Sequence, residues 1–134
     1  MAKRGPIVMQ RGTAAVEFAL VLPLLLTLVL GAIDWGWLFY LQQVVANGAR
    51  EAARAGSLEG TDAALAVSDA QVACTAYVTN AGLDKTKAAC TATADTGCPS
   101  NCVSVTLTYP AGSMTGFLTS IMPASTQAKA VMRR

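Results

Sequence analysis

A run of 16 uncharged residues, 18–33, most constrains what this chain can fold into, and a carboxylate, Glu17, stands directly before it. As a helix rising about 1.5 Å per residue, the run covers about 24 Å, somewhat less than the roughly 30 Å of a bilayer's hydrocarbon core. Aromatic residues suited to a membrane interface extend it: Trp35, Trp37, Phe39 and Tyr40. The pattern predicts a membrane span over about residues 16–41, with Asp34 near one headgroup layer and Glu17 near the other.

The apolar pattern continues beyond the predicted span. A stripe at helical spacing contains Leu38, Leu41, Val45, Ala49, Ala52 and Gly56. We therefore predict one helix over residues 13–56, half in lipid and half in water. Its helix should kink at Pro23, because the proline ring removes a backbone hydrogen bond. A cleaved secretory signal peptide is the alternative, but no small-x-small cleavage site ends the run.

The charges are unevenly distributed about the run. Lys3, Arg4 and Arg11 precede it, whereas residues 13–134 carry 7 of the 10 basic side chains and all 8 acidic ones. Basic residues favour the cytoplasmic side of a membrane, so the N-terminus should be cytoplasmic and residues 57–134 exported. We expect no nucleic-acid partner, because the exported part has no basic patch.

A second helix is expected after a short loop. Thr61 and Asp62 can cap it, Gly82 can end it near Ala81, and Gly56 is a plausible C-cap for the first helix. Its expected inner stripe is Val67, Ala70, Cys74, Tyr77, Val78 and Ala81. A small-residue face on the first helix would let the second lie close against it: Ala49, Ala52, Ala53 and Gly56.

The last third of the chain predicts a small antiparallel sheet. Residues 88–95 and 102–109 are rich in Thr and Val, and the second segment alternates apolar and hydroxyl side chains with a period of two. Residues 112–123 predict a loop with a short apolar helical turn, and 125–132 an edge-like third strand. The expected fold class is α+β, with a long N-terminal helix and an exported domain over residues 57–134.

The four cysteines all follow the apolar run, and disulfides form in an exported compartment. Four cysteines allow three pairings. Loop length favours Cys98 with Cys102 at the hairpin tip and Cys74 with Cys90 between the second helix and the first strand. A zinc site is the alternative, disfavoured by the absence of histidine and by the C-x3-C spacing.

No catalytic constellation is present in the sequence. The chain has no histidine, so the Ser-His and Cys-His arrangements are excluded, and the acidic residues of the exported part fall at loop and cap positions. Glycine-rich phosphate-binding patterns are also missing. We therefore expect no enzyme, no metal and no cofactor.

The segment "GTAAVEFALVLPLLL", followed by "NGAREAARAG", resembles the TadE-like pilins or pseudopilins of tight-adherence (Tad) pilus systems, within the type IV pilin class. Gly12, Glu17 five residues on and Pro23 carry the resemblance. It implies a prepilin in the bacterial inner membrane whose leader, residues 1–12, is removed by a prepilin peptidase after Gly12. In a bundle of such helices, Glu17 would pair with the new Thr13 amine of a neighbouring subunit.

The resemblance implies a structural role as a minor pilin or pseudopilin of a Tad or type IV-like pilus. The implied partners are other pilin subunits, the prepilin peptidase, the pilus assembly platform and inner-membrane lipid. The domain would lie in the periplasm or on an extracellular pilus. The alternative is a single-pass anchored binding module or adhesin without a role in assembly.

Overall fold

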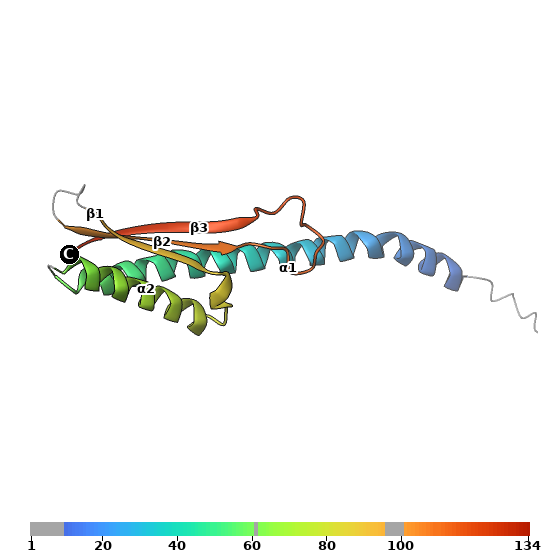
Figure 1. The fold of residues 1–134 in the computed structure, drawn as a ribbon. Coiled ribbons are helices and arrows are strands. Elements are labelled where there is room, and N and C mark those ends of the chain that lie inside the picture. The colour runs from blue at the N-terminus through green and yellow to red at the C-terminus, as the bar shows by residue number, and fades with distance from the viewer. Residues whose placement is uncertain (1–9, 61, 96–100) are drawn as a thin grey trace, which may run out of the picture.

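The computed structural model describes residues 10–60, 62–95 and 101–134. In chain order the elements are α1 (Gln10–Ser57), α2 (Ala63–Asn80), the short 3-10 helix η1 (Lys85–Lys87), β1 (Ala89–Asp95), β2 (Cys102–Pro110) and β3 (Ser125–Arg133). Figure 1 shows the sheet and α2 gathered around one half of α1, while the other half projects away. The predicted α+β class, with a long helix, a second helix and three antiparallel strands, is confirmed.

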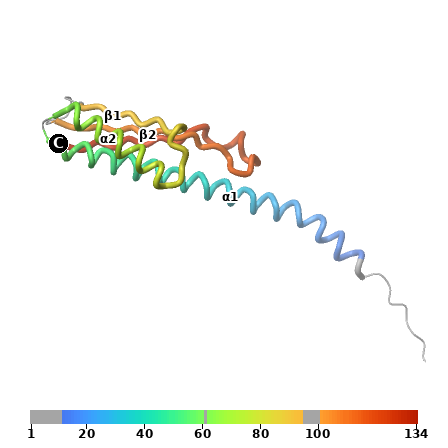
Figure 2. The backbone as a smooth tube through the Cα atoms, turned by 60° about the horizontal axis from the view of Figure 1, so that its bottom comes forward, coloured from blue at the N-terminus to red at the C-terminus, as the bar shows by residue number. Residues whose placement is uncertain are grey.

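The single long helix is α1. It begins three residues before the predicted start, ends one residue after the predicted end and passes through Pro23 unbroken. The kink expected at Pro23 stays a prediction. Leu41, Ala49 and Ala52 of the predicted stripe have no exposed surface. The periodicity of the sequence thus identified the face of α1 that the domain covers, and both ribbon and tube show the covered half (Figures 1 and 2).

Capping and close packing position α2. The Asp62 carboxylate accepts hydrogen bonds from the backbone N–H groups of Ala64 (2.9 Å) and Leu65 (3.2 Å), which satisfies two orphan donors of the first turn. Four residues of α2 are buried: Ala66, Ala70, Cys74 and Val78. Ala66 is buried although the predicted stripe did not include it. Val67 and Tyr77, which the stripe did include, pack against the core but are only partly buried.

Gly56 is not a C-cap, so that prediction is wrong. It lies inside α1 and is buried. A Cβ atom there would be 2.6 Å from the backbone carbonyl oxygen of Ala66 and 3.0 Å from the Cβ of Ala70. Glycine is therefore present because α1 and α2 approach too closely for any side chain, as the predicted small-residue face implied.

The sheet has the order β1-β2-β3, with both pairs antiparallel. Val103, Val105 and Leu107 of β2 are fully buried on one face, which packs on α1 and α2. The opposite face carries hydroxyl side chains, and the Thr93 and Ser104 hydroxyls hydrogen-bond across the strands at 2.7 Å. The period-two pattern read from the sequence is confirmed, and β3 is an edge strand as expected.

A disulfide between Cys74 and Cys90 ties α2 to β1, the pairing expected from loop length. Cys102 is also disulfide-bonded. Cys98, the partner expected for it, lies outside the described residues. A covalent cross-link therefore joins α2 to β1 in the domain.

Candidate assembly site

The N-terminal half of α1 lies largely uncovered by the other described residues. Its apolar side chains are exposed over residues 12–33, except for the half-buried Leu22, Leu30 and Gly31. Leu20 is 75% exposed and Phe18 is 63% exposed. Among the described residues, α1 alone is long and apolar enough to cross a membrane. So large an apolar surface is costly in water, and it indicates burial in lipid or against other helices.

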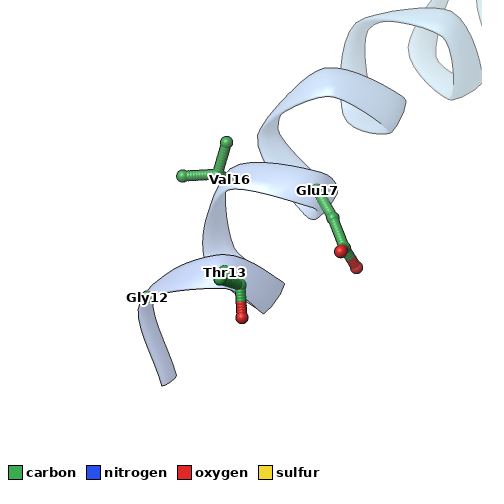
Figure 3. Close-up of a pocket in the computed structure, with 4 residues that line it drawn as sticks. All are labelled: Gly12, Thr13, Val16 and Glu17. Carbon is green, nitrogen blue, oxygen red and sulfur yellow. The ribbon is translucent and has the colours of Figure 1, made fainter. Parts of the chain in front are cut away.

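The expected processing and assembly residues lie together at the start of this half-helix. Gly12, Thr13, Val16 and Glu17 line one shallow hollow, and Thr13 and Glu17, four residues apart, share a helix face. Figure 3 shows their oxygen atoms directed to one side of the helix, with Val16 directed to another. Apart from its own neighbours in the helix, no atom of the described residues lies within 4 Å of a Cβ built on Gly12. The backbone at the expected cleavage site is open to approach.

Glu17 is exposed, and nothing in residues 10–60, 62–95 and 101–134 forms a hydrogen bond or an ion pair with its carboxylate. The carboxylate therefore stands without a partner on a helix whose next 16 residues are uncharged.

Asp34 has a role that the sequence did not reveal. It has no exposed surface, and its carboxylate accepts hydrogen bonds from the Ser113 hydroxyl (2.7 Å), the Thr115 hydroxyl (2.7 Å) and N–H (2.9 Å), and the Leu118 N–H (3.3 Å). These donors satisfy a buried charge. The sequence does contain Ser113-Met114-Thr115-Gly116, a pattern typical of a turn held by hydroxyl groups. This pattern predicts a turn, but it does not identify Asp34 as the hydrogen-bond acceptor.

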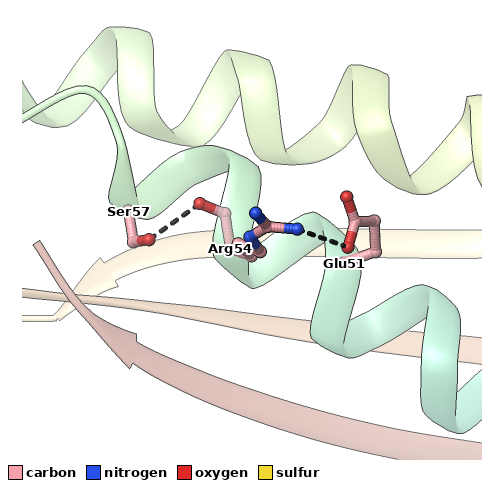
Figure 4. A network of polar contacts seen from close by, with 3 residues as sticks. All are labelled: Glu51, Arg54 and Ser57. Carbon is pink, nitrogen blue, oxygen red and sulfur yellow. Dashed lines mark hydrogen bonds and ion pairs between the residues drawn. The ribbon is translucent and has the colours of Figure 1, made fainter.

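The distal end of α1 carries an exposed ion pair. Arg54 lies 3.8 Å from Glu51, and the Ser57 hydroxyl donates to the Arg54 carbonyl oxygen at 2.7 Å (Figure 4). Both charged side chains are more than half exposed, so solvent screens the pair and it stabilises the fold little.

Two carboxylates, the exposed Asp84 and the half-buried Glu59, have shifted pKa values. Hydrogen bonds from the Thr86 hydroxyl and N–H hold the pKa of Asp84 below its ordinary value of 3.8. A hydrogen bond and repulsion from Asp69 raise the pKa of Glu59 above its ordinary value of 4.5. The first carboxylate caps η1 and the second lies in the loop after α1, so both shifts have structural causes.

The described residues hold no group of three or more His, Cys, Asp or Glu side chains that could bind a metal ion. The expected absence of a metal and of a cofactor stays a prediction.

Comparison with known proteins bears on the same stretch of α1. Residues 12–54 match the family model described as TadE-like protein. This segment of the long helix is therefore similar to TadE-like proteins. No curated protein and no solved structure matches the chain. The match confirms the resemblance drawn from the sequence, and it includes Gly12, Thr13, Glu17 and Pro23.

The TadE-like segment covers both halves of α1, the exposed apolar half and most of the half that packs into the domain. The TadE-like family is a structural, pilus-related family. The expected absence of enzymatic activity stays a prediction. α1 is thus a candidate membrane anchor, and its sequence over residues 12–54 is similar to that of TadE-like proteins.

Proposed function

We propose that this chain is a minor pilin or pseudopilin, held in the bacterial inner membrane as a prepilin and cleaved after Gly12. The TadE-like match, the open backbone at Gly12 and the uncovered apolar half of α1 support the proposal. In it, a prepilin peptidase removes residues 1–12 on the cytoplasmic side. The subunit then joins other pilin subunits through α1 at the pilus assembly platform, with its domain on the outer side.

The membrane span of this proposal ends where the domain begins. Asp34, Leu38 and Leu41 are buried within the domain, so this face of α1 is unavailable to lipid beyond residue 33. We therefore place the lipid-facing segment at about residues 16–33, shorter on this face than the 16–41 predicted from hydropathy.

The observation that carries the proposal is the Glu17 carboxylate, which has no partner among the residues that the structure describes. Cleavage after Gly12 creates an α-amino group at Thr13 on the same helix face, and in a bundle of helices a neighbour's amine can neutralise the carboxylate. In a dry bundle the attraction is weakly screened, and removing one partner of such a pair costs about 3–5 kcal/mol. The pair would also fix the axial register between subunits.

Glu17→Ala tests the proposal, with Glu51→Ala as the matched control on the same helix. The proposal expects the Glu17→Ala chain to be processed and folded but absent from complexes with partner pilins, because a buried amine would be left unpaired. Glu51→Ala removes an exposed carboxylate and should assemble normally.

Assembly of Glu17→Ala at the yield of the unmodified chain would refute the charge pair. The single-pass anchored binding module would then be the better account.

A further inference from the structure

The segment between β2 and β3, residues 111–124, exposes large apolar side chains and carries no charge. Met114 is 67% exposed, Phe117 is 50% exposed and Ile121 is 72% exposed. No charged residue occurs in the sequence between Asp95 and Lys129. We name residues 111–124 the apolar loop. An exposed loop of a water-facing domain normally carries polar side chains, so this one requires an apolar neighbour.

Hydrogen bonds to Asp34 fix the level of the apolar loop along α1. The donors are Ser113, Thr115 and Leu118, and their four hydrogen bonds are made where the exposed half of α1 ends. Figures 1 and 2 show the loop as the part of the sheet layer that reaches furthest toward the projecting half of α1. Its apolar side chains are therefore held at the end of the domain next to the proposed span.

Several backbone N–H groups of the loop form hydrogen bonds within the loop itself, as an environment poor in water requires. The N–H groups of Gly116 and Phe117 donate to the hydroxyls of Ser113 and Thr115, at 2.8 and 3.2 Å. Those of Ile121 and Met122 both donate to the Leu118 carbonyl oxygen at 3.0 Å. Non-helical backbone enters an apolar phase only when its polar groups are bonded within the protein.

The length of the uncovered apolar helix gives a second, independent argument. Residues 18–33 span about 24 Å, about 6 Å short of a typical hydrocarbon core of roughly 30 Å. Directly beyond them on α1, Trp35 is 46% exposed and Phe39 is 58% exposed. A span shorter than the hydrocarbon core fits the bilayer better when neighbouring apolar groups lengthen its apolar surface. The apolar loop lies at the level where this extension is needed.

We propose that the apolar loop is a second membrane contact, inserting Met114, Phe117 and Ile121 into the outer interface of the phospholipid bilayer that α1 crosses. This inference rests on the proposed membrane span. Its ligand is the bilayer surface itself, because the loop is continuous with the span and offers apolar groups without charge. The domain would thus be seated on the membrane, with its sheet held upright beside α1.

Fluorine NMR on the full chain tests the inference, since the chain has only three phenylalanines and they report on different depths. Phe18 lies in the proposed span, Phe39 beyond its outer end on α1 and Phe117 in the apolar loop. The chain would carry 4-fluorophenylalanine and be reconstituted in phosphatidylcholine vesicles, with each signal assigned by a Phe→Leu variant. Leu58→Phe adds a water-exposed control at the distal end of α1, where Leu58 is 76% exposed.

Two paramagnetic probes then read the environment of each ring: a gadolinium chelate in the water and a phospholipid with a nitroxide near the headgroup. The inference expects Phe117 to be relaxed several-fold more by the lipid nitroxide than Leu58→Phe, and several-fold less by gadolinium. Ile121→Lys should shift Phe117 toward gadolinium relaxation. Val131→Lys, a matched change on the outer sheet face, should not.

Gadolinium relaxation of Phe117 alongside a protected Phe18 would overturn the inference and leave the proposed span intact. Gadolinium relaxation of Phe18 would overturn the span and the inference together. Protection of Phe117 from both probes would mean that a second copy of the chain covers the loop, which also contradicts insertion into lipid.

Discussion

Gly56→Ala should destabilise the domain, although alanine is the better helix former. In a helix interior this change gains about 1 kcal/mol from backbone propensity. The new Cβ would lie 2.6 Å from the Ala66 carbonyl oxygen, and a backbone atom cannot move aside as a flexible side chain can. Overpacking costs about 1–3 kcal/mol, and the rigid contact favours the upper end. We expect a net loss of about 1–2 kcal/mol in the free energy of unfolding.

The assay is urea unfolding of the full chain in mild detergent, followed by the near-ultraviolet circular dichroism of its tryptophans. With a slope of about 2 kcal/mol per molar urea, the expected loss lowers the midpoint of unfolding by roughly 0.5–1 M. Gly36→Ala is the matched control in the same helix, because a Cβ built there has no described atom within 4 Å apart from its own helix neighbours, and it should leave stability unchanged or raise it. Equal stabilisation by both substitutions would refute the close helix contact.

The remaining predictions concern the Cys74–Cys90 disulfide, the expected processing site at Gly12 and the Asp84 cap of η1. Replacing Cys74 and Cys90 by serine should cost about 3 kcal/mol of unfolding free energy in the same urea assay, because the bridge closes a loop with a sequence separation of 16. Gly12→Leu should block leader removal on a mass spectrum, since a side chain obstructs the close backbone approach that a peptidase needs. The pKa of Asp84 is lower in the folded chain than its ordinary value of 3.8, so the ionised carboxylate stabilises the fold above pH 3.8. This stabilisation is lost as the pH falls through the folded-state pKa. A carbon-13 NMR titration of the Asp84 carboxyl group should show the lowered pKa, and Thr86→Ala should raise it.

Local rules allowed much of the fold to be predicted from the sequence. Alternation of Val103, Val105 and Leu107 with hydroxyl residues identified a strand buried on one face, because successive side chains of a strand point to opposite faces. Asp62 identified the start of α2, because a carboxylate satisfies the free N–H groups of a first turn. Both features depend only on residues close together in the chain.

The features that the sequence did not reveal depend on distant residues. Hydropathy put Asp34 at a headgroup layer, but its partners, Ser113, Thr115 and Leu118, are separated from it by 79 to 84 residues. Gly56 near a helix end reads locally as a cap, whereas its actual constraint is the Ala66 backbone of another helix. The same limit applies to the assembly site, because any partner of Glu17 belongs to another subunit in the proposed mechanism.

The intact mass of the chain extracted from the membrane tests the central claim most directly. A pilin-like subunit processed after Gly12 should have the mass of residues 13–134, with two disulfides accounting for the loss of four hydrogens. Only cleavage at this bond creates the Thr13 amine that the assembly mechanism requires. A chain that retains residues 1–12 in cells with an active prepilin peptidase would contradict the account.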